Sequence, residues 1–321
     1  MNSASPLSSV ESKKWSTCVA PWTRRSTSRF TMSFGPNLRI GTIKGSGSRH
    51  KLTDTWGSTG LLRLRTADGA FSLEGEGFAW LQSSSRLFVS NKVHTIVHPE
   101  PAGGQSAATL TNPPPRPGTA IDIFSDRFDY AEKSGEGIYQ GDVRLAGTNL
   151  TMTGGILTVL VPKAERRLQS LTAETNVVLN YETFHATAQR AAYSVDTEQV
   201  LLTGHPTWRA EVREGRGDTL LLDRTNRVFT AEGQAWLRMP GRALGAGGFM
   251  RGAASPASSS LPGTNDFMEV SCRAYEVRTN SAVFRDEVQV TEWRDGQLQG
   301  KMRCGRLSVA FAGTNELQRM V

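Results

Sequence analysis

The stretch GDVRLAGTNLTMTGGILTVLV, from Gly141 to Val161, decides the fold of this chain. Its apolar residues alternate with polar ones in three short runs: Val143 and Leu145, then Leu150 and Met152, then Leu157, Val159 and Val161. Alternation with a period of two is typical of β-strands that bury one face. The stretch therefore predicts consecutive strands with one apolar face.

The same alternation continues through residues 121–240. It returns in LTAETNVVLNY (171–181), PTWRAEV (206–212) and RVFTAEGQAWLRM (227–239), and no segment shows the period of a helix. Corner positions recur at Gly141, Asn176, Gly204 and Gly233, at intervals of 35, 28 and 29 residues. Repeats of this length indicate stacked supersecondary units.

Other segments resemble parts of this block. FSLEGEGFAWLQ (71–82) is similar to VFTAEGQAWLRM (228–239), SDRFDYAEKSGEGIYQGDV (125–143) to SCRAYEVRTNSAVFRDEV (271–288), and TMTGGILTVLV (151–161) to KMRCGRLSVAF (301–311). In the main block another strand follows residues 151–161, so the last similarity predicts one more strand beyond Val321. We therefore expect the sequence to be a gene fragment. The sequence thus predicts a disordered basic tail (1–60), a short partial β repeat (61–98), a Pro/Gly linker (99–119), a main β domain (120–240), a second linker (241–266) and a truncated second β repeat (267–321).

Composition and charge narrow the class of protein. The chain has 321 residues, 38% apolar residues and 32 glycines, which suits a β structure with many turns and a thin core. Its net charge of +7 comes from residues 1–51, which carry nine basic side chains and one acidic one. The β region is close to neutral, so the charge does not indicate nucleic-acid binding. The sequence contains no run of 18 apolar residues, which a transmembrane helix would require. Residues 1–60 also lack the apolar core of a secretory signal.

Residues capable of catalysis or metal binding form only weak groups. Asp122, Asp126 and Asp129 lie close together, as acids do in some β-helix enzymes, but such spacing is more often a solvated face. His94 and His98 fall in a strand pattern, where a separation of four residues corresponds to about 13 Å. Two histidines this far apart do not bind the same metal ion. We therefore predict no catalytic residues, no metal site and no cofactor. Cys272 and Cys304 form no CxxC motif, and the sequence leaves open whether they pair.

A long chain without a polar constellation is more typical of a scaffold or a binding protein than of an enzyme. Two arrangements of the apolar face remain open. It closes on itself as an ordinary sandwich core, or it lines a groove that accepts acyl chains.

The order of several motifs resembles the OstA/LptA family of periplasmic lipopolysaccharide-transport proteins, which includes LptC and the N-terminal part of LptD. The resemblance rests on YQGDVRL (139–145), LTAETNVVL (171–179), TFHATAQRAAYSVDTEQVLLTGHPTW (183–208) and GDTLLLDRTNRVFTAEGQAWLR (217–238). It covers some 120 residues, with weaker likeness at 71–97 and 267–321. Each motif alone is unspecific, but their order along the chain is more specific for this family.

This resemblance implies an OstA-like open β-jellyroll of stacked antiparallel strands, repeated along the chain. Its apolar groove would shield the acyl chains of lipid A during export to the outer membrane, and open sheet edges would pair with other export components in the periplasm. The expected groove residues are Val143, Leu145, Leu150, Met152, Leu157, Val159, Val177, Leu179 and Tyr181. The alternatives are a structural or adhesive β-solenoid without lipid, and a β-helix carbohydrate-active enzyme that uses Asp122, Asp126 and Asp129.

Overall fold

The computed structural model describes residues 33–34, 38–39, 55–65, 71–98, 120–162, 168–240, 266–278, 281–312 and 316–320. Every regular element in these ranges is a β-strand. None of the described residues forms a helix long and apolar enough to cross a membrane. The prediction of an all-β fold is confirmed.

The strands follow one another along the chain. Their bounds are β1 (Ser33–Phe34), β2 (Leu38–Arg39), β3 (Thr55–Arg65), β4 (Phe71–Leu81), β5 (Arg86–Val97), β6 (Ile121–Ser125), β7 (Arg127–Ala131), β8 (Glu136–Ala146), β9 (Leu150–Leu160), β10 (Ser170–Tyr181), β11 (Phe184–Ser194), β12 (Gln199–Thr203), β13 (Thr207–Ala210), β14 (Arg213–Arg216), β15 (Thr219–Asp223), β16 (Val228–Pro240), β17 (Phe267–Arg278), β18 (Ser281–Arg294), β19 (Gln297–Ala312) and β20 (Glu316–Met320). Strands β1 and β2 pair with each other, and they and the start of β3 lie in the segment expected to be a disordered tail.

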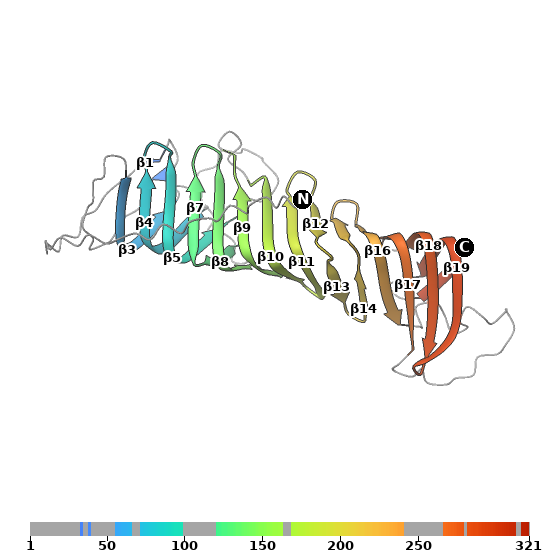
Figure 1. The fold of residues 1–321 in the computed structure, drawn as a ribbon. Helices are drawn as coiled ribbons and strands as arrows, with labels where there is room; N and C mark the ends of the chain where they lie inside the picture. The colour runs from blue at the N-terminus through green and yellow to red at the C-terminus, as the bar shows by residue number, and fades with distance from the viewer. Residues whose placement is uncertain are drawn as a thin grey trace, which may run out of the picture.

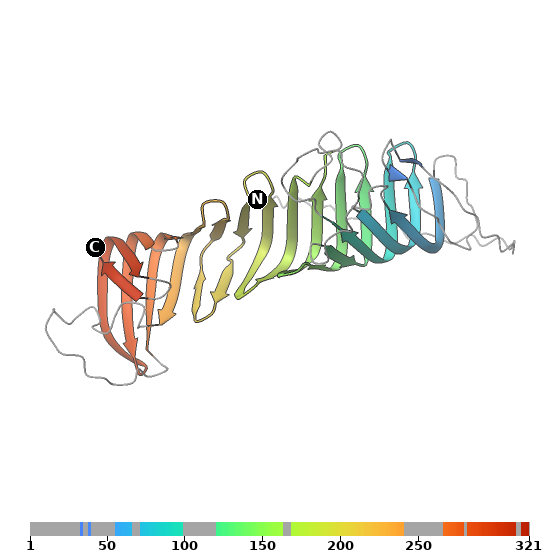
Figure 2. The ribbon, with the colours of Figure 1, turned by 180° about the vertical axis from the view of Figure 1, so that it is seen from behind.

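The strand pairings from β3 to β20 are antiparallel, which is the stacked antiparallel arrangement expected. Three successive pairs of short strands, β6 and β7, β12 and β13, and β14 and β15, are the two halves of one bent strand each, and they pair with the strands on either side. Figure 1 shows the result as an elongated molecule, with β3 near one end and β19 near the other. Figure 2 shows the same order from behind, where the blue to green strands curve over at their lower ends. Apart from Asp266, the predicted linkers lie outside the described residues. The strands that flank them pair directly, β5 with β6 and β16 with β17.

Each long strand is bent near its middle, which divides the sheet into two arms. The pairing register shifts at the bend, for example between Gln140 and Val143 in β8 and between Glu174 and Val177 in β10. Arm 1 comprises residues 55–58, 78–81, 86–89, 127–131, 136–140, 156–160, 170–174, 190–194, 199–203, 219–223, 228–232, 274–278, 281–285 and 306–310. Arm 2 comprises residues 61–65, 71–74, 93–97, 121–125, 143–146, 150–153, 177–181, 184–188, 207–210, 213–216, 235–240, 267–272, 288–293 and 297–304.

The bends coincide with the corner positions that the sequence predicts. Gly141, Asn176, Gly204 and Gly233 all have positive φ angles, between 52° and 83°. Positive φ is accessible to glycine and, more readily than to most residues, to asparagine. An extra residue at a β-bulge bends a strand and increases its twist. Gly141, Asn176 and Gly233 therefore lie within long strands, and Gly204 lies between the short strands β12 and β13; at all four corners arm 1 turns into arm 2.

Both arms contribute to one apolar core. Its buried members include Leu157 and Ala173 from arm 1 and Val143 and Val177 from arm 2. The strands alternate between inward apolar and outward polar side chains within each arm, as a half-buried antiparallel sheet requires. The interior between the arms is therefore the continuous apolar face that the alternation predicts.

Strand direction tests the similarities between segments. The segment of β4 before its bend lies in arm 2, whereas the segment of β16 before its bend lies in arm 1. The two strands run in opposite directions, so the likeness of residues 71–82 to 228–239 does not mark equivalent positions. In contrast, β9 and β19 both run from arm 2 to arm 1, so the similarity of residues 151–161 to 301–311 joins equivalent strands.

Replacing Gly141 by alanine is expected to destabilise the fold more than the same change at Gly296. Both glycines have positive φ, 79° and 75°, a region that costs an L-residue roughly 1–2 kcal/mol. A Cβ at Gly296 would meet nothing within 4 Å, whereas a Cβ at Gly141 would collide with the carboxylate of Asp126. Urea unfolding should show a loss of about 1 kcal/mol for Gly296→Ala and clearly more for Gly141→Ala. Equal losses would mean that Asp126 moves aside freely.

Candidate functional site

The interior between the two arms is the candidate site, and the nine expected groove residues can be placed in it. Eight of them belong to the apolar core or pack against it, and Tyr181 is the exposed one. They come from three adjacent strands: Val143 and Leu145 from β8, Leu150, Met152, Leu157 and Val159 from β9, and Val177, Leu179 and Tyr181 from β10.

On β9 and β10, burial of these side chains decreases with distance from the bends, whereas on β8 both Val143 and Leu145 are 2% exposed. Leu157 and Val177, next to the bends of β9 and β10, are 0% and 1% exposed. Val159 and Leu179, one step further along each arm, are only partly buried, and Tyr181 at the end of β10 is 39% exposed. The bend side of the interior is thus closed by protein packing, and a ligand would first meet the side chains at the free ends of the arms.

The walls of this interior are uncharged. Among the described residues, the buried side chains with polar groups are Thr95, Ser125 and Thr291 and the aromatic residues Tyr139, Tyr275 and Trp208, and none of these is charged at neutral pH. Next to β9, four inward positions of β10 and β11 are alanines, which are Ala173, Ala186, Ala188 and Ala191. Alanine leaves more room than the leucines and aromatic residues elsewhere in the core. An uncharged wall with small side chains suits apolar chains, because an ion buried there would lose its hydration.

The three acids considered for catalysis have separate surroundings. The Asp122 Oδ1 atom lies 2.7 Å from His94 Nε2, and Asp129 forms an ion pair with Arg86. Asp126, between β6 and β7, packs against Gly141, and its backbone N–H donates to the Gly141 carbonyl at 3.0 Å. The structure therefore gives no support to an acid cluster that shares one cleft.

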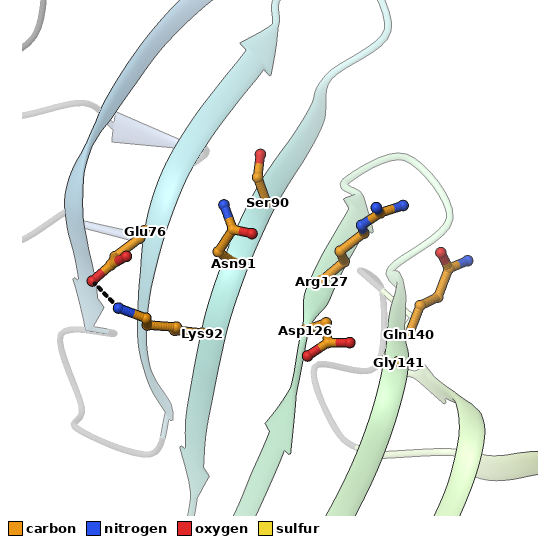
Figure 3. A pocket seen from close by; sticks show the side chains of 8 residues that line it. All are labelled: Glu76, Ser90, Asn91, Lys92, Asp126, Arg127, Gln140 and Gly141. Carbon is orange, nitrogen blue, oxygen red and sulfur yellow. Dashed lines mark hydrogen bonds and ion pairs between the residues drawn. The ribbon is translucent and has the colours of Figure 1, made fainter. Parts of the chain in front are cut away.

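A polar hollow of about 530 Å³ lies on the outside of the bends in β4, β5 and β8 (Figure 3). Its lining consists of Glu76, Ser90, Asn91, Lys92, Asp126, Arg127, Gln140 and Gly141. The Lys92 Nζ atom pairs with Glu76 Oε1 at 3.0 Å, as the dashed line in Figure 3 shows. Of the three acids, only Asp126 lines this hollow, and its hydrophilic lining contrasts with the interior.

Cys272 and Cys304 are both free thiols. They lie on β17 and β19, which are separated by β18, and Cys304 pairs in register with Val288 of that strand. Two strand spacings place their Cα atoms roughly 10 Å apart. This exceeds the distance of about 7 Å that a disulfide spans. Burial raises the pKa of the Cys272 thiol to about 12, so it remains protonated at neutral pH.

Metal ligands do not converge in the described parts of the chain, where no group of three or more His, Cys, Asp or Glu side chains could hold an ion. The fold and the interior together define a class of protein: a stack of bent antiparallel strands around an uncharged apolar face.

Comparison with known proteins identifies the family of one segment. Residues 122–228 match the family model described as LptA/(LptD N-terminal domain) LPS transport protein. The matched segment runs from β6 to the start of β16. The expected resemblance is confirmed for this segment.

Among solved structures, the chain is similar to LptH, the LptA homologous periplasmic component of the conserved lipopolysaccharide transport device from Pseudomonas aeruginosa. The identity is 17%, the TM-score is 0.33, and the alignment covers 43% of this chain and 90% of that chain. No curated protein matches the chain.

Proposed function

We propose that the protein binds lipopolysaccharide and shields the acyl chains of lipid A in the interior between its arms during export to the outer membrane. The observation that carries this proposal is the uncharged apolar face whose side chains become accessible toward the free ends of the arms. The match of residues 122–228 to a family of LPS transport proteins supports the same function.

The energy for binding comes from burial of hydrocarbon. Each CH₂ group moved out of water contributes about 0.8 kcal/mol, so an apolar wall holds acyl chains without a catalytic residue. In this proposal Leu150, Val159, Leu179 and Tyr181 touch the lipid first, while Leu157 and Val177 form the floor. The sugars of the lipid remain in water.

A protein of this kind binds and releases lipid but does not drive its movement. Directional transport then depends on an energy source elsewhere and on other export components in the periplasm. Sheet edges provide unpaired N–H and C=O groups for such contacts, because an added strand completes the hydrogen-bond ladder.

Photo-crosslinking to purified lipopolysaccharide tests the proposal. We expect probes at Val159 and Leu179 to label the lipid and probes at Thr158 and Val178 to label it weakly. The second pair occupies the adjacent positions on the same strands, whose side chains point to the opposite face. Equal labelling at all four positions would reject the interior as the binding site.

The second candidate is a structural β-solenoid that binds no lipid. It is favoured by one observation, which is that Leu157 and Val177 are already buried by protein. The same experiment separates the two functions, since a closed structural core predicts no labelling at any of the four positions in a folded protein.

A further inference from the structure

Four aromatic side chains cross the interior further along the stack, and we call them the aromatic bridge. Phe184 and Trp208 come from arm 2, and Phe229 and Tyr275 come from arm 1. The indole N–H of Trp208 donates to the Tyr275 hydroxyl at 2.9 Å, and both residues are buried. The bridge therefore joins the two arms directly through the core.

The rings of the bridge also pack against one another across the arms. The Phe229 ring lies edge-on to Trp208, with centroids 5.1 Å apart, and edge-on to Phe184, with centroids 6.2 Å apart. Edge-to-face pairs at such distances are attractive. Phe184 and Phe229 lie at the free ends of β11 and β16, whereas Trp208 and Tyr275 lie close to the bends. The bridge thus extends from the bends to the free ends of the arms.

The surrounding residues accommodate Trp208 in this position. The indole ring lies over Gly215 of β14, where a Cβ would come within 2.6 Å of Trp208 Nε1. Burial raises the pKa of the Tyr275 hydroxyl, so this group stays protonated and accepts the indole hydrogen bond. Breaking the bond without a substitute would leave the buried indole N–H unsatisfied, which is costly.

The apolar interior continues on both sides of the bridge. On one side are the expected groove residues of β8 to β10 and the alanines of β10 and β11. On the other side, the inward residues of β17 to β19 include Val270, Val290 and Met302. Phe229 and Tyr275 lie outside residues 122–228, so the bridge is only partly contained in the segment that matches the family model.

We propose that the aromatic bridge divides the interior into two compartments, so that acyl chains bound at β8 to β11 reach β17 to β19 only when Trp208 leaves Tyr275. This inference rests on the proposed function and specifies which part of the interior holds the lipid. Trp208 is then the residue that sets the boundary of the lipid site.

Photo-crosslinking to purified lipopolysaccharide tests the boundary, with one probe at Leu179 before the bridge and one at Met302 beyond it. In the unchanged protein we expect labelling at Leu179 and little at Met302. The Tyr275→Phe change removes the hydrogen-bond acceptor but keeps the ring. It should raise labelling at Met302 about fivefold, which is the population change expected for the loss of one hydrogen bond. Tyr139→Phe removes another buried hydroxyl outside the bridge and should leave Met302 weakly labelled.

Equal labelling of Leu179 and Met302 in the unchanged protein would overturn the proposal, as would an unchanged pattern in folded Tyr275→Phe. Absence of labelling at both positions would reject the proposed function, and a second measurement then decides whether the bridge is closed. Exchange of the Trp208 indole proton, followed by NMR and assigned with Trp208→Phe, should be slow and should accelerate in Tyr275→Phe. Fast exchange in the unchanged protein would contradict a closed bridge.

Discussion

Replacing Leu157 by alanine is expected to lower the free energy of unfolding by about 2–5 kcal/mol. Leu157 is 0% exposed and lies next to the bend of β9, where both arms meet. Truncation removes apolar contact and leaves a cavity that the paired strands β8 and β10 cannot fill, because their hydrogen-bond ladders fix their positions.

Chemical denaturation of Leu157→Ala measures this loss, with Thr153→Ala as the control on the same strand. The Thr153 side chain is exposed on the other side of the bend, so its truncation should change stability by no more than about 0.5 kcal/mol. Similar stabilities for the two variants would show that the bend side of the interior is not packed in solution. The floor of the proposed lipid site would then be open.

The alternation of apolar residues was enough to predict which side chains share a face. Val143 and Leu145 before the turn into β9, and Leu157 and Val159 at its end, all point into the interior. This succeeds because side-chain direction in a strand alternates with every residue, whatever the partner strand is. The bulge at each bend interrupts the alternation. The spacing of the apolar residues changes at the same points, so the interruption is visible in the sequence.

Positions of the bends were also visible in the sequence, but their role was not. Gly141, Asn176 and Gly233 mark points where the chain adopts positive φ, which residue type alone indicates. Residue type does not indicate whether such a point ends a strand or bends it. The pairing on both sides decides this, since β8 pairs with β9 both before and after Gly141.

Contacts between the arms could not be predicted. Trp208 and Tyr275 are 67 residues apart and belong to strands that do not pair with each other. The alternation places Trp208 on the apolar face, yet the partner across the interior depends on how the bends fold arm 1 onto arm 2. The same limit applies to β4 and β16, whose similar sequences run in opposite directions.

The double variant Val159→Asp and Leu179→Asp is expected to weaken lipopolysaccharide binding on the order of 1000- to 10,000-fold. Each change removes apolar contact from a partly buried position and places a carboxylate where an acyl chain would lie. Loss of contact costs about 1 kcal/mol per site at partial burial, and desolvation of the new polar group adds at least about 1–2 kcal/mol. Because about 1.4 kcal/mol is a factor of ten in affinity, two sites together reach this range.

Titration with lipopolysaccharide should compare this variant with Thr158→Asp and Val178→Asp, which add the same two charges at the adjacent outward positions. Because Val159 and Leu179 lie toward the free ends of the arms, their carboxylates can turn to water in the lipid-free protein, and circular dichroism should show an intact β fold. Weak binding in the inward variant alone would separate contact in the interior from the effect of net charge. Equal loss in both variants would instead indicate electrostatic repulsion of the phosphorylated lipid. Unchanged binding in a folded inward variant would place the acyl chains outside the interior of β9 and β10.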